Sequence, residues 1–112
     1  MPVRYTPPRP EDLLPVKGVA LGTAPARIKK WQRDDLLLAA FDAGTVAAGA
    51  FTQNRFAAAP VAVCRSHLAE SGEVRALIVN AGNANAGTGA AGIAAAEATC
   101  AAVASILDCA AP

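Results

Sequence analysis

The segment that most restricts how this chain can fold is residues 76–92, ALIVNAGNANAGTGAAG. It begins with a short apolar run, Ala76–Val79, which is typical of a strand. A loop of small residues with three asparagines follows, and glycines then lead into an alanine-rich stretch typical of a helix. Because small side chains allow another backbone or a ligand to come close, this loop is the first candidate for a functional role.

The remaining sequence predicts further strands and two helices. Strand-like apolar stretches precede the loop at Val16–Ile28, Leu36–Phe41 and Thr45–Thr52. Helical spacing of apolar residues appears in Ala57–Leu68 and Ala90–Leu107. Turn residues at 42–44 predict that the second and third strands form an antiparallel hairpin. The predicted order is βββαβα, an α/β fold with an incomplete sheet, after an extended proline-rich lead-in over residues 1–15.

Both predicted helices have a narrow apolar face. In the first helix this face contains Val61, Cys64 and Leu68. In the second it contains Ile93, Ala96, Cys100, Val103 and Leu107. We therefore expect Cys64 and Cys100 to be buried core residues and not nucleophiles.

Composition excludes several classes of function. Hydrophobic residues make up 54% of the chain but aromatic residues only 4%, which predicts a thin core that packs against something else. A net charge of +1 gives no field for nucleic acid or an anionic membrane. Three cysteines without CxxC spacing predict neither a disulfide framework nor a zinc site, and they fit a reducing cytoplasm. The longest apolar stretch, residues 90–107, is interrupted by polar residues, so we expect no membrane span.

Three motifs have both a chemical and a structural interpretation. Gly87–Gly92 matches GxGxxG, but seven residues separate it from the predicted strand, and Asp108 follows a helix where a second strand is required. This weakens the alternative of a small nucleotide-binding domain. His67 has no nucleophile beside it in sequence, and a surface histidine near a helix C-terminus explains it. Asp34–Asp35 suits a charged turn before a strand as well as a metal pair.

Asn80, Asn83 and Asn85 are the candidate site residues of the loop. Asparagine closes Asx-turns and tolerates left-handed backbone, so loop shape alone explains the three residues. The functional interpretation is that their amides orient a neighbouring catalytic segment or a polar substrate. We favour the structural role over direct substrate contact, and we expect no cofactor and no metal.

Several segments, taken in order and spacing, resemble one family. GVALGTAPARIK, DLLLAAFDAGTVAAGAFTQNRFAAAPV and above all LIVNAGNANAGTGAAG are similar to the N-terminal part of the ornithine acetyltransferases, the bifunctional glutamate N-acetyltransferases of arginine biosynthesis. The resemblance covers about residues 16–108. Family members more often have Ser at the position of Ala81 and Cys at that of Gly87.

The resemblance implies an autoprocessing, mixed-sheet acetyltransferase fold of the ArgJ/DmpA type. Such an enzyme cuts itself before a threonine, which becomes the N-terminus of a β chain and carries acetyl from N-acetylornithine to glutamate. A Thr-Gly pair in an STGVIG-type segment of the α chain forms the oxyanion hole. Neither the segment nor the nucleophile lies in this sequence, and Thr88-Gly89 belongs to the loop motif.

On this basis residues 16–112 are expected to be the N-terminal portion of a truncated α chain that lacks catalytic residues. Its implied partners are its own downstream α segment and β chain, in an α2β2 assembly in the cytoplasm. Alone, the chain is expected to be inactive and to expose apolar surface. A non-catalytic interaction module that folds by itself stays open as a further alternative.

Overall fold

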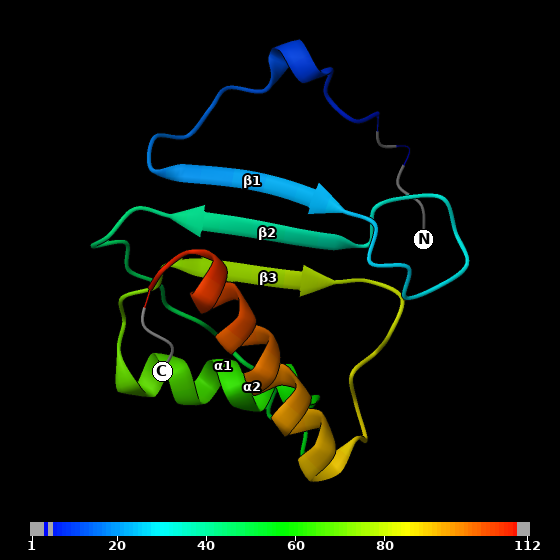
Figure 1. Cartoon of the computed structure of the whole chain (residues 1–112), viewed down its shortest axis with the longest axis vertical. Helices are drawn as coiled ribbons and strands as arrows, with labels where there is room; N and C mark the ends of the chain where they lie inside the picture. Colours follow the sequence, from blue (N-terminus) through cyan, green and yellow to red (C-terminus); the bar gives the residue numbers. More distant parts are fainter. Residues whose placement is uncertain (1–3, 5, 110–112) are drawn as a thin grey trace.

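The computed structural model describes residues 4 and 6–109 of the chain. Its elements are a 3-10 turn η1 (Pro10–Asp12), β1 (Val19–Ala24), β2 (Leu36–Phe41), α1 (Ala59–Glu70), β3 (Ala76–Asn80) and α2 (Gly89–Ile106). The strands form one sheet in the order β1-β2-β3, and both pairings are antiparallel (Figure 1). The predicted α/β class is confirmed.

The hairpin predicted for Thr45–Thr52 is wrong. In that segment only Val46 forms a β-bridge, an isolated one with Glu73. The partner of β2 on this side is β3, with Leu38 opposite Ile78, while Gly22 of β1 lies opposite Leu38 on the other side. Because both edges of β2 are occupied, the alternating pattern of residues 45–52 has no strand left to pair with. Packing of the more apolar β3 prevails over this local strand preference.

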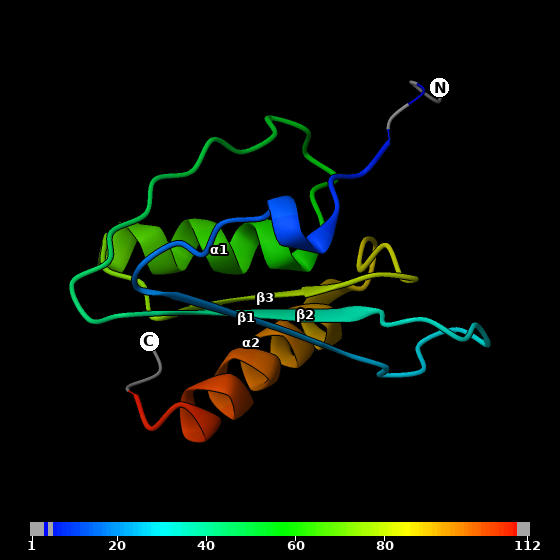
Figure 2. The same ribbon diagram turned by 90° about the horizontal axis from the view of Figure 1, so that it is seen from above.

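The two helices pack on each other beside the β3 edge, and α2 also contacts β3. Seen from the β1 side, one helix lies on each side of the strands (Figure 2). The contact between the helices is close because its residues are small: a Cβ built on Gly92 would lie 3.5 Å from the Cβ of Ala59. The β1 edge of the sheet is left without a covering helix (Figure 1).

The buried face of α1 differs from the predicted one. Ala59 and Val63 are buried, whereas Cys64, predicted to be in the core, is exposed. The small Ala59 permits the approach of α2, and this selects the face that includes Val63.

The stripe predicted for α2 is confirmed only in part. Val103 is buried, but Cys100, predicted to be a core residue, is half-buried, as are Ala96 and Leu107. Ile93 is 40% exposed, and Gly92 lies in the contact with α1 instead.

The core is small, as the composition predicts. Its buried apolar residues are Ala39, Ala59, Val63, Val103 and Ala104. By length and composition alone α2 could cross a membrane, with a mean hydropathy of 1.5. That hydropathy comes largely from alanine, and the helix contacts α1 and β3.

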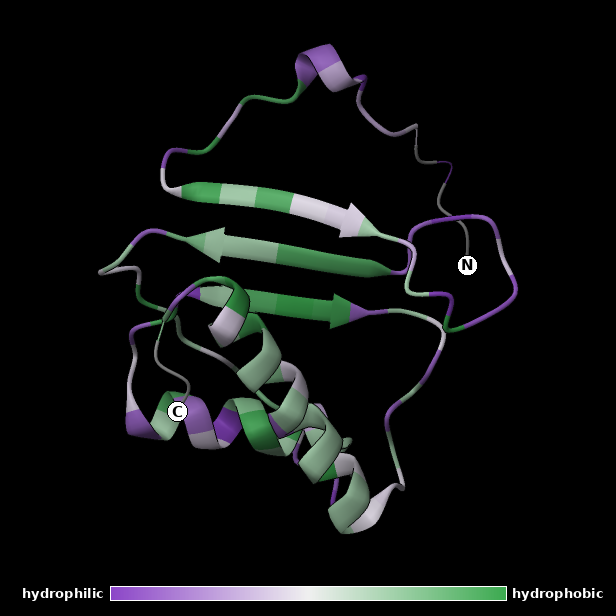
Figure 3. Ribbon diagram, in the orientation of Figure 1, coloured by the Kyte–Doolittle hydropathy of each residue, from purple (hydrophilic) through white to green (hydrophobic). Residues whose placement is uncertain are grey.

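One face of the sheet carries several exposed apolar side chains. The strand register places Ala39 between Leu21 and Leu77, and Leu37 beside Val79. Leu21 is 71% exposed, Leu77 49% and Val79 44%. Figure 3 shows the apolar character of β2 and β3. Ala39, at the centre of this face, is buried. We call the three exposed residues, Leu21, Leu77 and Val79, the open sheet face.

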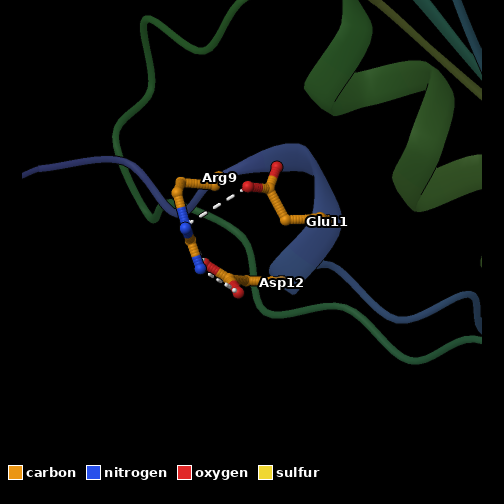
Figure 4. A network of polar contacts seen from close by, with 3 residues as sticks. All are labelled: Arg9, Glu11 and Asp12. Atoms are coloured by element: carbon orange, nitrogen blue, oxygen red, sulfur yellow. Dashed lines mark hydrogen bonds and ion pairs between the residues drawn. The ribbon is translucent and has the colours of Figure 1, made fainter.

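The described part of the lead-in lies at the surface. Arg9 contacts the carboxylates of Asp12, at 3.0 Å from Nε, and Glu11, at 3.4 Å (Figure 4). All three side chains are exposed, so these ion pairs contribute little to stability. Residues 1–3 and 5 of the predicted lead-in, and 110–112 at the other end, lie outside the described residues.

The corrected face of α1 can be tested by Val63→Ala. Removing two methyl groups from a buried position lowers the free energy of unfolding by about 1–3 kcal/mol, measured by urea denaturation. Val16→Ala makes the same chemical change at a residue that is 66% exposed and is expected to change it by less than about 0.5 kcal/mol. Equal losses in the two variants would show that this face of α1 is not buried.

Candidate functional site

The candidate site is the junction where β3 ends and both helices begin. It consists of residues 80–89, here called the Asn loop, and residues 25–35, here called the Asp35 turn. The loop leaves β3 at Asn80 and enters α2 at Gly89. Two backbone hydrogen bonds join it to its surroundings: Ala81 N donates to the Asp35 carbonyl at 2.8 Å, and Ala59 N donates to the Asn85 carbonyl at 3.2 Å. One loop therefore connects the sheet, α1 and α2.

The three asparagines act on each other within the loop. Asn85 has a φ of 56°, in the left-handed region that asparagine tolerates. Its Nδ2 donates to Oδ1 of Asn80 at 2.9 Å, and its backbone N donates to Oδ1 of Asn83 at 3.4 Å. The second contact has the form of an Asx-turn. These bonds account for all three residues through loop shape, the structural role that the sequence favours.

Asp35 is the buried charged residue of the described chain, with 3% of its surface exposed. Its carboxylate accepts hydrogen bonds from Ala26 N at 2.6 Å, Ile28 N at 2.9 Å and Trp31 Nε1 at 3.3 Å. Burial raises the pKa of this carboxyl, but the hydrogen bonds from Ile28, Ala26 and Trp31 outweigh it and hold the pKa below its ordinary value. The carboxylate thus fixes the conformation of the Asp35 turn.

Trp31 transmits this order to the Asn loop. A Cβ built on Gly82 would lie 3.1 Å from Trp31 Cζ2, so the indole ring packs directly against the loop backbone. The Arg33 guanidinium stacks 3.9 Å from the ring centroid, and Lys29 Nζ lies 5.6 Å from it. Sequence reasoning placed Asp34–Asp35 in a charged turn but missed the buried role of Asp35. The available signal was the single tryptophan four residues before it.

The glycines of the GxGxxG match lie at the start of α2, as the pattern predicts. Gly87 and Gly89 have positive φ, and Gly87, Thr88 and Gly89 line a cavity of about 240 Å³ together with Arg55 and Phe56. Two features differ from a dinucleotide site. The sheet is antiparallel where that fold requires parallel strands, and the last glycine of the match faces helix α1.

His67 lies half-buried in a groove of about 530 Å³ between the helices. The same groove contains Ser66, Glu70, Glu97 and Cys100. Burial raises the pKa of the Cys100 thiol, and the neighbouring Cys64 and Glu97 raise it further. The thiol therefore stays protonated at neutral pH and is no activated nucleophile. Among the described residues no group of three or more side chains could hold a metal ion.

Comparison with known proteins identifies one family. The model of the ArgJ family matches residues 20–112. A crystal structure of the arginine biosynthesis bifunctional protein ArgJ from Bacillus halodurans is similar, with a TM-score of 0.79 and 31% identity over 84% of this chain and 49% of that one. A crystal structure of ornithine acetyltransferase from Mycobacterium tuberculosis in complex with ornithine is also similar. Its TM-score is 0.77, with 41% identity over 82% of this chain and 48% of that one. This chain spans about half the length of each.

Asp35→Asn tests the role of the buried carboxylate. The amide cannot accept the three hydrogen bonds as the carboxylate does, so we expect the Tm at pH 7 to fall by about 5 °C or more. Asp42→Asn, the same change at an exposed aspartate, is expected to leave it within about 2 °C.

The pH dependence has a defined sign. Because the folded-state pKa of Asp35 lies below its unfolded value of about 3.9, the carboxylate stabilises the fold above that pH. This stabilisation is lost as the pH falls through the folded-state pKa, so the Tm difference between wild type and Asp35→Asn narrows below pH 4. A constant difference from pH 7 to pH 3 would argue against the ionised carboxylate.

Loop shape can be separated from side-chain bonding at Asn85. Asn85→Ala loses the bond to Asn80 and places alanine at positive φ, which lowers the free energy of unfolding by about 1–2 kcal/mol. Asn85→Gly loses the same bond but adopts this φ freely, so it costs less than the alanine variant in urea denaturation. A glycine variant as unstable as the alanine variant would contradict the backbone explanation.

Proposed function

Because the chain belongs to the ArgJ family, we propose that it is the N-terminal half of the α chain of an ornithine acetyltransferase that serves arginine biosynthesis. The observation that carries the proposal is the family match over residues 20–112, which includes the whole Asn loop. The names of the two similar structures support it, and the chain corresponds to about half of each. The motif differences at Ala81 and Gly87 exchange one small residue for another.

In the proposed reaction a threonine takes acetyl from N-acetylornithine and passes it to glutamate. The precursor is cut before that threonine, whose hydroxyl then forms an acyl-threonine intermediate. The nucleophile and the Thr-Gly pair of the oxyanion hole would both lie downstream of residue 112. Residues 1–112 would supply no catalytic group, so the half chain alone is inactive.

The Asn loop is proposed to lie in the vicinity of the active site and to position its neighbours. Asn80, Asn83 and Asn85 bond among themselves, which supports a shaping role over direct substrate contact. The Asp35 turn contacts the Asn loop through Trp31, which bonds to Asp35 and packs against Gly82. A rigid loop with little side-chain bulk would let a catalytic segment approach closely.

The open sheet face is the proposed contact for the rest of the same protein. Its exposed leucines and valine form an apolar surface of the kind that folded proteins cover. We propose that the downstream α segment and the β chain cover it, within a cytoplasmic α2β2 assembly. N-acetylornithine and glutamate are the proposed substrates of that assembly.

The experiment is to express the complete reading frame, determine the masses of its products and assay acetyl transfer. We expect two chains whose masses sum to that of the precursor, together with transfer from N-acetylornithine to glutamate. The 112-residue chain, assayed in parallel, is expected to show no transfer.

An uncut and inactive product would overturn the proposal. The chain would then be an α/β interaction module, and a cooperative thermal transition of the monomeric half chain would support that role. Transfer activity of the half chain by itself would contradict the absence of catalytic groups.

A further inference from the structure

The hydrogen bonds between β1 and β2 show which backbone groups of β1 face outward. The two strands are antiparallel and in continuous register. On this register Asp42 N donates to the Gly18 carbonyl at 3.0 Å, and Asp35 N donates to the Ala24 carbonyl at 3.2 Å. Successive residues of a strand direct their backbone groups to opposite sides. The even-numbered residues of β1 therefore bond to β2, and the odd-numbered ones direct their amides and carbonyls to the outer edge of the sheet.

The outward residues of β1 are Val19, Leu21 and Thr23. The amide of Val19 donates to the Val16 carbonyl at 3.2 Å, which leaves only its own carbonyl free. Among the residues that the structure describes, none forms a hydrogen bond with the outward backbone groups of Leu21 or Thr23. All six residues of β1 are exposed. The outer edge of β1 thus offers both donors and acceptors to another strand.

β1 has none of the features that keep a free edge from pairing. Natural edge strands carry a charged residue, a proline or a bulge for this purpose. The strand sequence, VALGTA, contains no charge and no proline, and its pairing with β2 has no bulge. Leu21, in the middle of the strand, is 71% exposed. A regular, apolar edge of this kind is expected to be covered in the functional protein.

The described part of the proline-rich lead-in is unsuited to cover this edge. Its backbone hydrogen bonds close the 3-10 turn, as from Leu13 N to the Pro10 carbonyl at 3.2 Å. The prolines at positions 7, 8, 10 and 15 lack the amide that a paired strand donates. The strand that covers β1 therefore has another source.

We propose that β1 is an inner strand in the whole protein, and that a strand from the chain beyond residue 112 pairs with its outer edge through backbone hydrogen bonds. This source rests on the proposed function, which supplies further chain of about the same length, since this chain covers 49% and 48% of the two similar ones. The open sheet face, which that chain is proposed to cover, reaches the edge at Leu21. The added strand extends the sheet and covers Leu21 together.

The edge also determines which side chains the added strand carries. The residue that faces Leu21 lies on the open sheet face, so an apolar side chain there buries Leu21. The residue that faces Gly22 lies on the opposite face, where nothing comes within 4 Å of a Cβ built on Gly22. A large side chain fits there and shields the glycine backbone. The partner is thus an extended apolar segment with a bulky residue facing Gly22.

The test is hydrogen exchange at single-residue resolution in the complete reading-frame product, with rates corrected for intrinsic exchange. The amides of Ala20 and Gly22 bond to β2 and serve as the internal reference for those of Leu21 and Thr23. We expect the two sets to exchange at rates within about tenfold of each other, because β1 is paired on both sides. Faster exchange than this at Leu21 and Thr23 would refute the added strand.

Leu21→Pro, with Leu21→Ala as its matched control, gives a second measurement in the same product. Both variants lose the leucine side chain, but only proline loses the outward amide, and proline is tolerated where that amide faces water. We expect the Tm of the proline variant to be lower than that of the alanine variant by at least about 3 °C, because a bonded donor is lost. A smaller difference would show that the amide is unpaired.

Acetyl transfer, assayed on the same preparation, separates this inference from the proposed function. An active product with fast exchange at Leu21 and Thr23 contradicts the added strand alone. An uncut, inactive product with slow exchange there contradicts the proposed function and keeps the pairing. Protection that falls on dilution would assign the edge to a second copy of the protein and contradict the proposal.

Discussion

The organisation of this chain depends on the buried carboxylate of Asp35. One side chain accepts three hydrogen bonds from the turn that precedes β2, and the carbonyl of the same residue accepts the amide of Ala81 at the end of β3. Asp35 therefore fixes a turn, the start of the central strand and the first residue of the Asn loop together. A buried charge of this kind is tolerated only because its acceptors are satisfied.

Small residues determine the rest of the architecture. Ala59 and Gly92 let α1 and α2 touch, and alanine in the core fills space that larger side chains fill elsewhere. The result is a thin core and a sheet face with exposed apolar side chains. The chain belongs to the ArgJ family and spans about half the length of the two similar chains. The proposed function assigns the missing cover to the remainder of the same protein.

Local sequence patterns predicted the elements whose packing partner is near in sequence or whose pattern is strong. Leu36–Phe41 forms β2 with the predicted bounds, and Val103 of the stripe predicted for α2 is buried. The strand predicted for residues 45–52 does not pair with β2, because different segments compete for the same edge of β2. β3 occupies the edge that this segment would need. The prediction that Cys64 is buried on α1 was wrong. The side of α1 that is buried is set by the contact of Ala59 with Gly92, two small residues far apart in the sequence.

The candidate site was predictable in part. The three asparagines predicted a loop whose conformation depends on their side chains. Their side chains do form hydrogen bonds within the loop, one of them an Asx-turn. The support from Asp35 and Trp31 was not predictable, because it joins segments almost fifty residues apart and no local pattern marks a carboxylate for burial.

The most direct test of the account compares hydrogen exchange of the β1 and β3 amides in the 112-residue chain with that in the complete reading-frame product. We predict that exchange slows at least about tenfold in the complete product because the open sheet face is covered there. Equal exchange rates in the two proteins would contradict the claim that this chain is one part of a larger fold.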